Sequence, residues 1–295
     1  MSMLAPEHAE EHLGGGGVYA VTRRSKLAGE LGRVHTLEKC GSAMRVNILG
    51  VGIHAVNPDE AVDRIERFVA EGGAHYVCVS NVFSTMVSQR DSEFRRITNE
   101  ADLAVPDGMP LAWLARWHGY DQRDRVYGPD LMLGCCERSV ETGTSHFFYG
   151  GAEGVPELLA QNMTERFPGL KVAGCYSPPF RPLTAAEDEE VVSMINASGA
   201  DVVWVGLGAP KQERWMAAHV GRIKAPVMVG VGAAFPFHTG TVKQAPKWMQ
   251  KSGLEWLFRL CVEPRRLWRR YLLNNPLFIL LTLCQLTGLK KYDLS

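Results

Sequence analysis

The chain has 295 residues, of which 46% are hydrophobic and 22% are charged, so it fits a globular protein of one large or two modest domains. This composition excludes disorder along the whole chain, and ordinary contents of 30 Gly and 16 Pro exclude a collagen-like repeat. The seven Cys contain no CxxC pair and form no even set. We therefore expect reduced thiols in a cytosolic protein, without a zinc site or a disulfide framework.

The formal net charge of zero conceals a strong asymmetry along the chain. Residues 243–295 carry ten basic and three acidic side chains, a net charge of +7, and residues 1–242 carry −7. A basic segment indicates an anionic partner, either a nucleic acid or a membrane surface, and we expect the membrane. The late apolar run at 277–286 is about half of the ~20 residues that a spanning helix needs. Residues 1–13 lack the pattern of a secretory signal, so we expect a protein that lies on a membrane without crossing it.

Three regions follow one another along the chain. Residues 1–43 are polar and rich in Gly, which predicts a flexible extension. Residues 44–250 alternate between apolar strands and amphipathic helices, and residues 251–295 form a basic helical appendage. We expect strands at 46–53, 75–80, 103–105, 145–149, 171–175, 201–205 and 227–231. We expect helices at 57–71, 82–99, 109–117, 155–167, 184–197 and 212–220.

Alternating strands and helices predict an α/β fold with a doubly wound, mostly parallel, Rossmann-like sheet. Ligands of such sheets bind beyond the carboxyl ends of the strands, where three glycine-rich turns are expected here. Glycines there let backbone N–H groups approach a phosphate, although a tight turn also needs glycine for geometry alone. Three such turns in succession favour a nucleotide or nucleotide-sugar pocket. The candidate nucleotide-binding residues are Gly150, Gly151, Gly206, Gly208, Lys211 and Gly232.

Three polar side chains beside predicted strand ends or in a loop are candidates for chemistry. Asp107 follows a strand and can face a cleft, or it can cap the next helix. Asn81 also follows a strand, and it can bind sugar hydroxyls or act as a cap. Arg125 lies in a loop where its guanidinium can bind phosphate oxygens or pair with a neighbouring aspartate.

The patterns of several other enzyme classes are missing. The sequence has no Asp-x-Asp pair and no His-Cys ligand spacing, so we expect neither a metal nor another cofactor. It also lacks the GxSxG motif of hydrolases and the GxxxxGK[ST] phosphate loop. His238 lies near the last glycine turn, and we interpret it as a structural residue.

The basic segment from Gly253 to Tyr271 mixes arginines with aromatic residues. Arg259, Arg266 and Arg269 are seven and three positions apart, a spacing that places them on one side of a helix. Pro264 is expected to open the second of two helices. The pattern predicts an interfacial element at a lipid surface, and a basic helix packed on the body is the alternative.

Several runs in this order resemble the WecG/TagA/CpsF family of glycosyltransferases, and the resemblance covers residues 45–293. These runs are Ala101–Gly108, Arg125–Leu131, Gly206–Trp215, Gly240–Pro246 and Gly253–Tyr271.

The resemblance implies an inverting, metal-independent transfer of a hexose or N-acetylhexosamine, for example N-acetylmannosamine. The donor would be a UDP-sugar and the acceptor a polyprenyl-diphosphate-linked sugar, used for surface polysaccharide at the inner face of the cell membrane. By this resemblance Asp107 is the catalytic base, and Asn81, Arg125 and Gln212 bind substrate. The tail arginines named above would hold the lipid diphosphate. Homo-oligomerisation stays open.

Two positions depart from the family pattern. The pocket threonine two residues before Asn81 is Val79 here, and the aspartate usual after the last glycine turn is Pro236. The first affects the donor sugar, and the second affects contacts with the nucleoside. Two other functions remain as alternatives: a Rossmann-type oxidoreductase, disfavoured because no GxGxxG follows a strand, and a membrane-surface scaffold that binds a nucleotide sugar without turnover.

Overall fold

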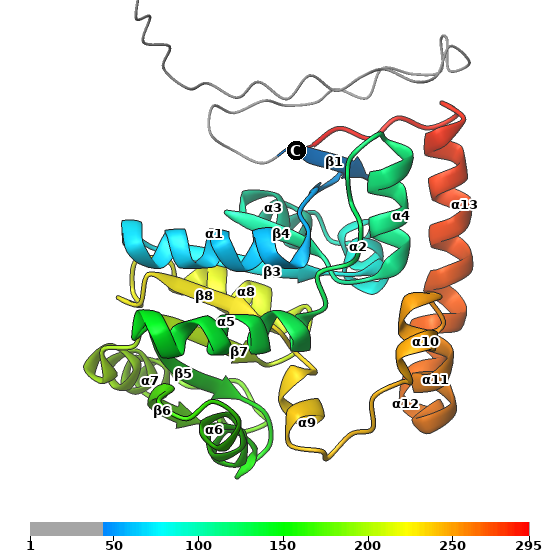
Figure 1. Cartoon of the computed structure of the whole chain (residues 1–295). Helices are drawn as coiled ribbons and strands as arrows, with labels where there is room; N and C mark the ends of the chain where they lie inside the picture. Colours follow the sequence, from blue (N-terminus) through cyan, green and yellow to red (C-terminus); the bar gives the residue numbers. More distant parts are fainter. Residues whose placement is uncertain (1–43, 295) are drawn as a thin grey trace, which may run out of the picture.

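The computed structural model describes residues 44–294 (Figure 1). The extension expected at residues 1–43 lies outside this described part. The strands are β1 (Arg45–Ile48), β2 (Val51–His54), β3 (His75–Ser80), β4 (Leu103–Pro106), β5 (Ser145–Gly150), β6 (Lys171–Tyr176), β7 (Val202–Gly206) and β8 (Val227–Gly230).

The helices before the C-terminal segment are α1 (Pro58–Glu71), α2 (Val82–Ser88), α3 (Ser92–Glu100), α4 (Met109–Trp117), α5 (Gly128–Thr142), α6 (Val155–Arg166), α7 (Ala185–Ser198), α8 (Lys211–His219) and α9 (Ala234–His238). The C-terminal segment contains α10 (Lys247–Lys251), α11 (Glu255–Val262), α12 (Pro264–Trp268), the π-helical turn η1 (Arg269–Leu273) and α13 (Asn274–Leu286).

Six of the strands form one parallel sheet in the order β4-β3-β8-β7-β5-β6. Helices cover both faces, with α1, α5 and α6 on one side and α3, α7 and α8 on the other. Val77 and Val79 of β3 pack in the hydrophobic core on the side of α1, α5 and α6. Tyr76 and Cys78 pack in the core on the side of α3, α7 and α8. Burial on both faces explains why these strands are continuous apolar runs. The α/β, Rossmann-like prediction is confirmed.

The helix starts follow from local sequence. Asn57 caps α1 in a capping box with Glu60, and Pro58 occupies the first turn, where its missing N–H costs no hydrogen bond. Thr184 and Glu187 form the same arrangement at α7. Such caps satisfy N–H groups that the helix leaves unpaired, so the predicted starts of these two helices agree closely with the structure.

The single strand predicted at 46–53 is wrong. The segment turns at Leu49 and Gly50, which have φ angles of 53° and 82°, and β2 returns antiparallel to β1. Both strands are almost entirely buried, so no polar alternation marks the turn.

The single helix predicted at 82–99 is also divided. α2 ends at Ser88, and α3 starts anew at Ser92. Asp91 interrupts the helix because its carboxylate accepts a hydrogen bond from the N–H of Phe94 at 2.9 Å, in the manner of an N-cap.

The C-terminal helices pack against the α/β body. Phe278 of α13 is 5% exposed and joins the core cluster beside α2 and the β1–β2 hairpin. The Gln285 side chain accepts from the N–H of Leu49 and donates to the carbonyl of Asn47, both at 2.9 Å. Pro264 opens α12, as predicted. No helix within residues 44–294 is long and apolar enough to cross a membrane.

Two of the glycines at the strand ends are required by packing. A Cβ at Gly150 would lie 2.7 Å from the backbone of Gly206, and a Cβ at Gly206 would lie 2.8 Å from the buried ring of Phe235. Gly208 differs, because no atom lies within 4 Å of the position that its Cβ would take. The need for a tight turn therefore explains Gly150 and Gly206. It does not explain Gly208, beside which there is room for a Cβ.

We predict that Gly150→Ala lowers the free energy of unfolding by roughly 3 kcal/mol or more, because backbone strain at φ 123° adds to a backbone clash. Gly208→Ala is the matched control. Its φ is 78° and its surroundings are open, so only the strain of about 1–2 kcal/mol applies. Urea denaturation of both variants measures the difference, and equal losses would contradict the packing argument.

Candidate functional site

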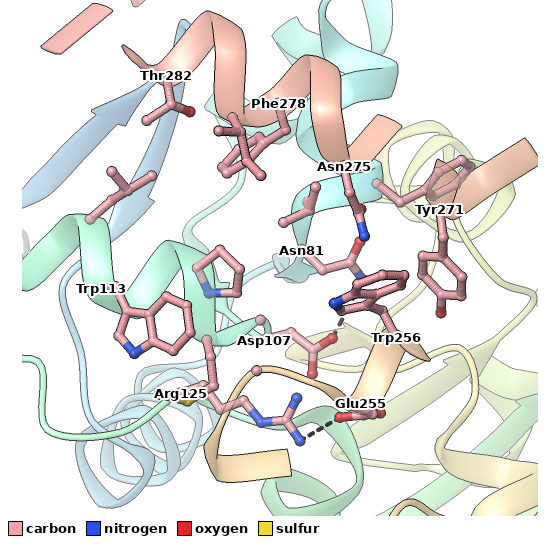
Figure 2. Close-up of a pocket in the computed structure, with 18 of the residues that line it drawn as sticks. Asn81, Asp107, Trp113, Arg125, Glu255, Trp256, Tyr271, Asn275, Phe278 and Thr282 are labelled. Atoms are coloured by element: carbon pink, nitrogen blue, oxygen red, sulfur yellow. Dashed lines mark hydrogen bonds and ion pairs between the residues drawn. The ribbon is translucent and has the colours of Figure 1, made fainter. Parts of the chain in front are cut away.

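A cavity of about 560 Å³ opens at the carboxyl ends of β3 and β4, beneath the C-terminal helices (Figure 2). This volume lies in the usual range of small-molecule sites, roughly 300–1,000 Å³. Polar side chains gather at one end of it, and apolar side chains of α4 and α13 line the other. The polar end contains Asn81, Asp107, Arg125, Glu255, Arg259 and Arg270, while Asn275 and Thr282 are polar residues on the α13 side.

Asp107 directly follows β4 and points into the centre of the cavity. One carboxylate oxygen accepts from the N–H of Gly128, the first residue of α5, at 3.1 Å. α4 has no side-chain cap, so the alternative in which Asp107 caps the following helix is wrong. Burial raises the pKa of Asp107; Arg125 counteracts this rise and Glu255 adds to it. A carboxyl with a raised pKa suits a general base.

Asn81 is a helix cap, and its binding of sugar hydroxyls stays a prediction. Its Oδ1 accepts from the N–H of Ser84 at 3.2 Å and caps α2. This cap leaves Nδ2 directed at the carboxylate of Asp107, 3.4 Å away. The helix cap therefore decides which end of the amide faces the cavity.

Arg125 pairs with a residue far away in the sequence. Its guanidinium lies 2.6 Å from the carboxylate of Glu255 on α11 and 4.1 Å from the centre of the Tyr127 ring. The neighbouring aspartates that the sequence offered as partners are not bound by this guanidinium. Glu255 has no recognisable motif, so sequence reasoning missed it.

Two further arginines line the cavity, and one of them was missed. Arg259 lies over the ring of Phe237, and Arg270 lies 4.1 Å from the centre of the Phe83 ring. Within residues 44–294, neither guanidinium forms an ion pair with a carboxylate. Burial lowers the pKa of Arg270, because the charged form loses solvation. Partly buried cations without a carboxylate partner in this part of the chain suit an anionic ligand.

The three tail arginines expected on one side of a helix are separated. Only Arg259 reaches the cavity; Arg266 is exposed and pairs with Glu263, and Arg269 is exposed beside Trp268. Glu263, with φ −129° and ψ 60°, interrupts the helix. Because the helix is broken there, residues on its two sides that are seven positions apart need not share a face. Arg270, instead of Arg266 or Arg269, lines the cavity.

Gln212 lies elsewhere along the same edge of the sheet. Its Oε1 accepts from the N–H of Gly208 at 3.0 Å, and a Cβ at Gly232 would lie 3.3 Å from it. Gln212 therefore binds the turn after β7 and lies close to the turn after β8. Lys211, the first residue of α8, is exposed. The candidate glycines end or follow β5, β7 and β8, and none of them lines the cavity around Asp107.

The two departures from the family pattern lie in packed positions. Val79 is 7% exposed, and its Cγ1 would lie 3.4 Å from a Cβ placed on Gly128. Pro236 lies in α9, where its carbonyl accepts from the N–H of Val242 at 3.0 Å. His238 contacts the carbonyl of Pro129 through Nε2 at 3.0 Å, as expected for a structural residue. Among residues 44–294, no group of three or more His, Cys, Asp or Glu side chains is placed to hold a metal ion.

Glu213, beside Gln212, is a buried carboxyl with an unusual environment. It is 2% exposed, and its Oε1 accepts from Nε2 of Gln212 at 3.1 Å. Its Oε2 finds no hydrogen-bond partner in the described part of the chain. Burial raises the pKa of Glu213 to about 7. The folded state therefore favours the protonated carboxyl.

We predict that this carboxyl makes the protein less stable as the pH rises. Because the folded pKa is raised from 4.5 to about 7, the folded state binds the extra proton between these values. The cost reaches about 3 kcal/mol above pH 7, at about 1.4 kcal/mol per pKa unit. Glu213→Gln should gain stability over the wild type at pH 8 but much less at pH 5. Glu141→Gln, at an exposed position, is the control, and parallel pH curves for E213Q and the wild type would contradict the prediction.

Comparison with known proteins shows which family the chain resembles in sequence. The model of the "Glycosyl transferase WecG/TagA/CpsF family" matches residues 46–292. An N-acetylglucosaminyldiphosphoundecaprenol N-acetyl-beta-D-mannosaminyltransferase of Bacillus spizizenii is 29% identical over 204 residues, which cover 69% of this chain and 77% of the relative. An enzyme of the same name from Staphylococcus aureus is 26% identical over 246 residues, covering 83% and 94%.

Proposed function

The chain belongs to the WecG/TagA/CpsF family and is a glycosyltransferase, and we propose that it transfers a sugar from a UDP-sugar to a polyprenyl-diphosphate-linked sugar. The observation that carries this proposal is the position of Asp107, a carboxylate in a cavity that also holds Arg259 and Arg270, which have no carboxylate partner in the described part of the chain. Family membership favours a transferase over an oxidoreductase or a scaffold without turnover.

Asp107 is proposed to be the general base. It takes the proton from a hydroxyl of the acceptor sugar as that oxygen attacks the anomeric carbon of the donor. The new C–O bond forms on the face opposite the nucleotide, the bond to the nucleotide breaks, and the electron pair leaves with UDP. A single displacement of this kind inverts the anomeric centre. Asn81 steadies the carboxylate through its Nδ2.

The arginines of the cavity are proposed to bind the diphosphate of the UDP-sugar donor and the diphosphate of the lipid acceptor. Arg125 lies beside Asp107 and is proposed to stabilise the charge that develops on the leaving UDP. The glycine turns lie outside this cavity, farther along the same edge of the sheet, and their N–H groups are proposed to bind the donor nucleotide. Gly208 supports this role because its surroundings are open. Arg259 and Arg270 are proposed to hold the acceptor's diphosphate. Arg266 and Arg269 are exposed and suit contact with the anionic headgroups of a membrane.

The donor and the location of the enzyme are further parts of the proposal. The names of the two relatives support transfer of an N-acetylhexosamine, so UDP-N-acetylmannosamine is the proposed donor. The reaction is further proposed to take place at the inner face of the cell membrane and to serve surface polysaccharide. The arginines supply positive charge without a metal ion. Turnover of a panel of UDP-sugars in the presence of EDTA, with the product identified by mass, tests the reaction class, the donor and metal independence together.

We predict that Asp107→Asn lowers turnover by ~10²-fold or more, because an amide cannot accept the proton. Binding of UDP and the midpoint of thermal unfolding should stay close to those of the wild type. The wild-type rate should fall as the pH drops through the raised pKa of Asp107, and this dependence should disappear in the variant. Near-normal turnover of D107N would remove Asp107 from the mechanism.

Arg270 and Arg269 are adjacent in sequence and differ in environment, which makes them a matched pair. Arg270→Gln should lower kcat/KM for the diphosphate acceptor by roughly 10- to 100-fold, since a charged hydrogen bond contributes about 1.5–3 kcal/mol. Arg269→Gln should change this value little in a membrane-free assay, because the side chain points away from the cavity. Equal effects of the two variants would refute the proposed role of Arg270.

A further inference from the structure

The cavity continues from Asp107 into an apolar groove between α4 and α13. Trp113 and Trp117 of α4 line one wall, and Ile279, Leu283 and Leu286 of α13 line the other. Figure 2 shows Trp113 across the cavity from the side of α13 that carries Phe278 and Thr282. Asp107 and Arg125 lie farther from α13, in the centre and lower part of the view. The groove and the polar site are therefore two ends of one space.

The groove keeps large apolar side chains in contact with solvent. Trp117 is 75% exposed, Ile279 is 59% exposed and Leu283 is 55% exposed. A contiguous apolar surface of this kind marks a binding site more often than an ordinary protein surface. At the other end of the cavity lie Arg259 and Arg270, which form no ion pair with a carboxylate between residues 44 and 294. The complementary ligand has an anionic head and an apolar chain.

Trp113 stands where the two ends of the cavity meet. Gly253, in the turn before α11, lies so close that a Cβ there would come within 2.7 Å of the indole ring. Its φ of 73° also favours glycine. The absence of a side chain at this turn lets the ring stand beside the passage from the arginines to the apolar groove.

We propose that this groove, between α4 and α13, binds the first isoprene units of the acceptor lipid while the diphosphate lies at Arg259 and Arg270. This inference rests on the proposed function and adds a recognition site for the chain itself. It makes the lipid a determinant of substrate choice as well as an anchor in the membrane.

The apolar residues of α13 separate into two sets, which allows a clean test. Ile279 and Leu283 line the groove, whereas Leu280 is 57% exposed and does not line it. Successive helix positions point about 100° apart, so Ile279 and Leu280 face different surroundings. A general contact with the membrane would use either set, but a chain-binding groove uses only the first.

The experiment compares two soluble acceptors without membrane or detergent. Both are N-acetylglucosaminyl diphosphate esters, one carrying a methyl group and the other three isoprene units. The wild type should prefer the prenyl ester by tenfold or more in kcat/KM. Ile279→Ser and Trp117→Ala, from opposite walls, should lower this preference about tenfold, and Leu280→Ser should retain it. Equal preference in all variants, or none in the wild type, would overturn the inference.

A binding measurement separates this inference from the proposed reaction. Farnesyl diphosphate should bind the wild type and L280S at least tenfold more tightly than inorganic diphosphate, and I279S should lose this advantage. This result supports the groove even if no acceptor is turned over, in which case only the proposed function fails. If farnesyl diphosphate binds no better than inorganic diphosphate, and I279S instead abolishes self-association in sedimentation, the groove is an interface between copies and the inference is wrong.

Discussion

The ion pair between Arg125 and Glu255 connects the two parts of the molecule on which the site depends. Arg125 belongs to the loop before α5, and Glu255 opens α11, so the pair holds the C-terminal helices over the strand ends. The two side chains are only 9% and 13% exposed. Removing one partner of such a pair leaves an uncompensated charge, at a cost of roughly 3–5 kcal/mol. The pair also sets the field around Asp107, because its two members shift the pKa of that carboxyl in opposite directions.

The cavity beside this ion pair is polar at one end and mostly apolar at the other. Near the sheet it contains carboxylates and guanidinium groups. Towards α13 most of its lining side chains are apolar, and several of them, such as Ile279 and Leu283, are exposed. Burial strengthens each electrostatic contact at the first end, since fewer water molecules screen it. The second end favours apolar groups for the opposite reason, because they leave water on binding. One cavity can therefore bind both the charged and the apolar part of an amphiphilic substrate.

Local signals in the sequence predicted elements well where they act over a few residues. The capping boxes at Asn57 and Thr184 marked the starts of α1 and α7, and Pro264 marked the start of α12. The same logic failed at residues 46–53, where both strands of a hairpin are buried and no alternation shows the turn. It also failed for the tail arginines, because helical spacing loses its meaning across the break at Glu263.

The sequence by itself determined the α/β class, the starts of α1, α7 and α12, and the residues that follow the strand ends, including Asn81 and Asp107. It could do so because periodicity, capping and the shared carboxyl edge of parallel strands are written in neighbouring residues. Only the tertiary structure decided that Glu255 pairs with Arg125, that Arg270 faces the cavity instead of Arg266 and Arg269, and that α13 forms a groove with α4. These contacts join residues far apart in the chain, and their geometry depends on how the helices pack rather than on any local pattern.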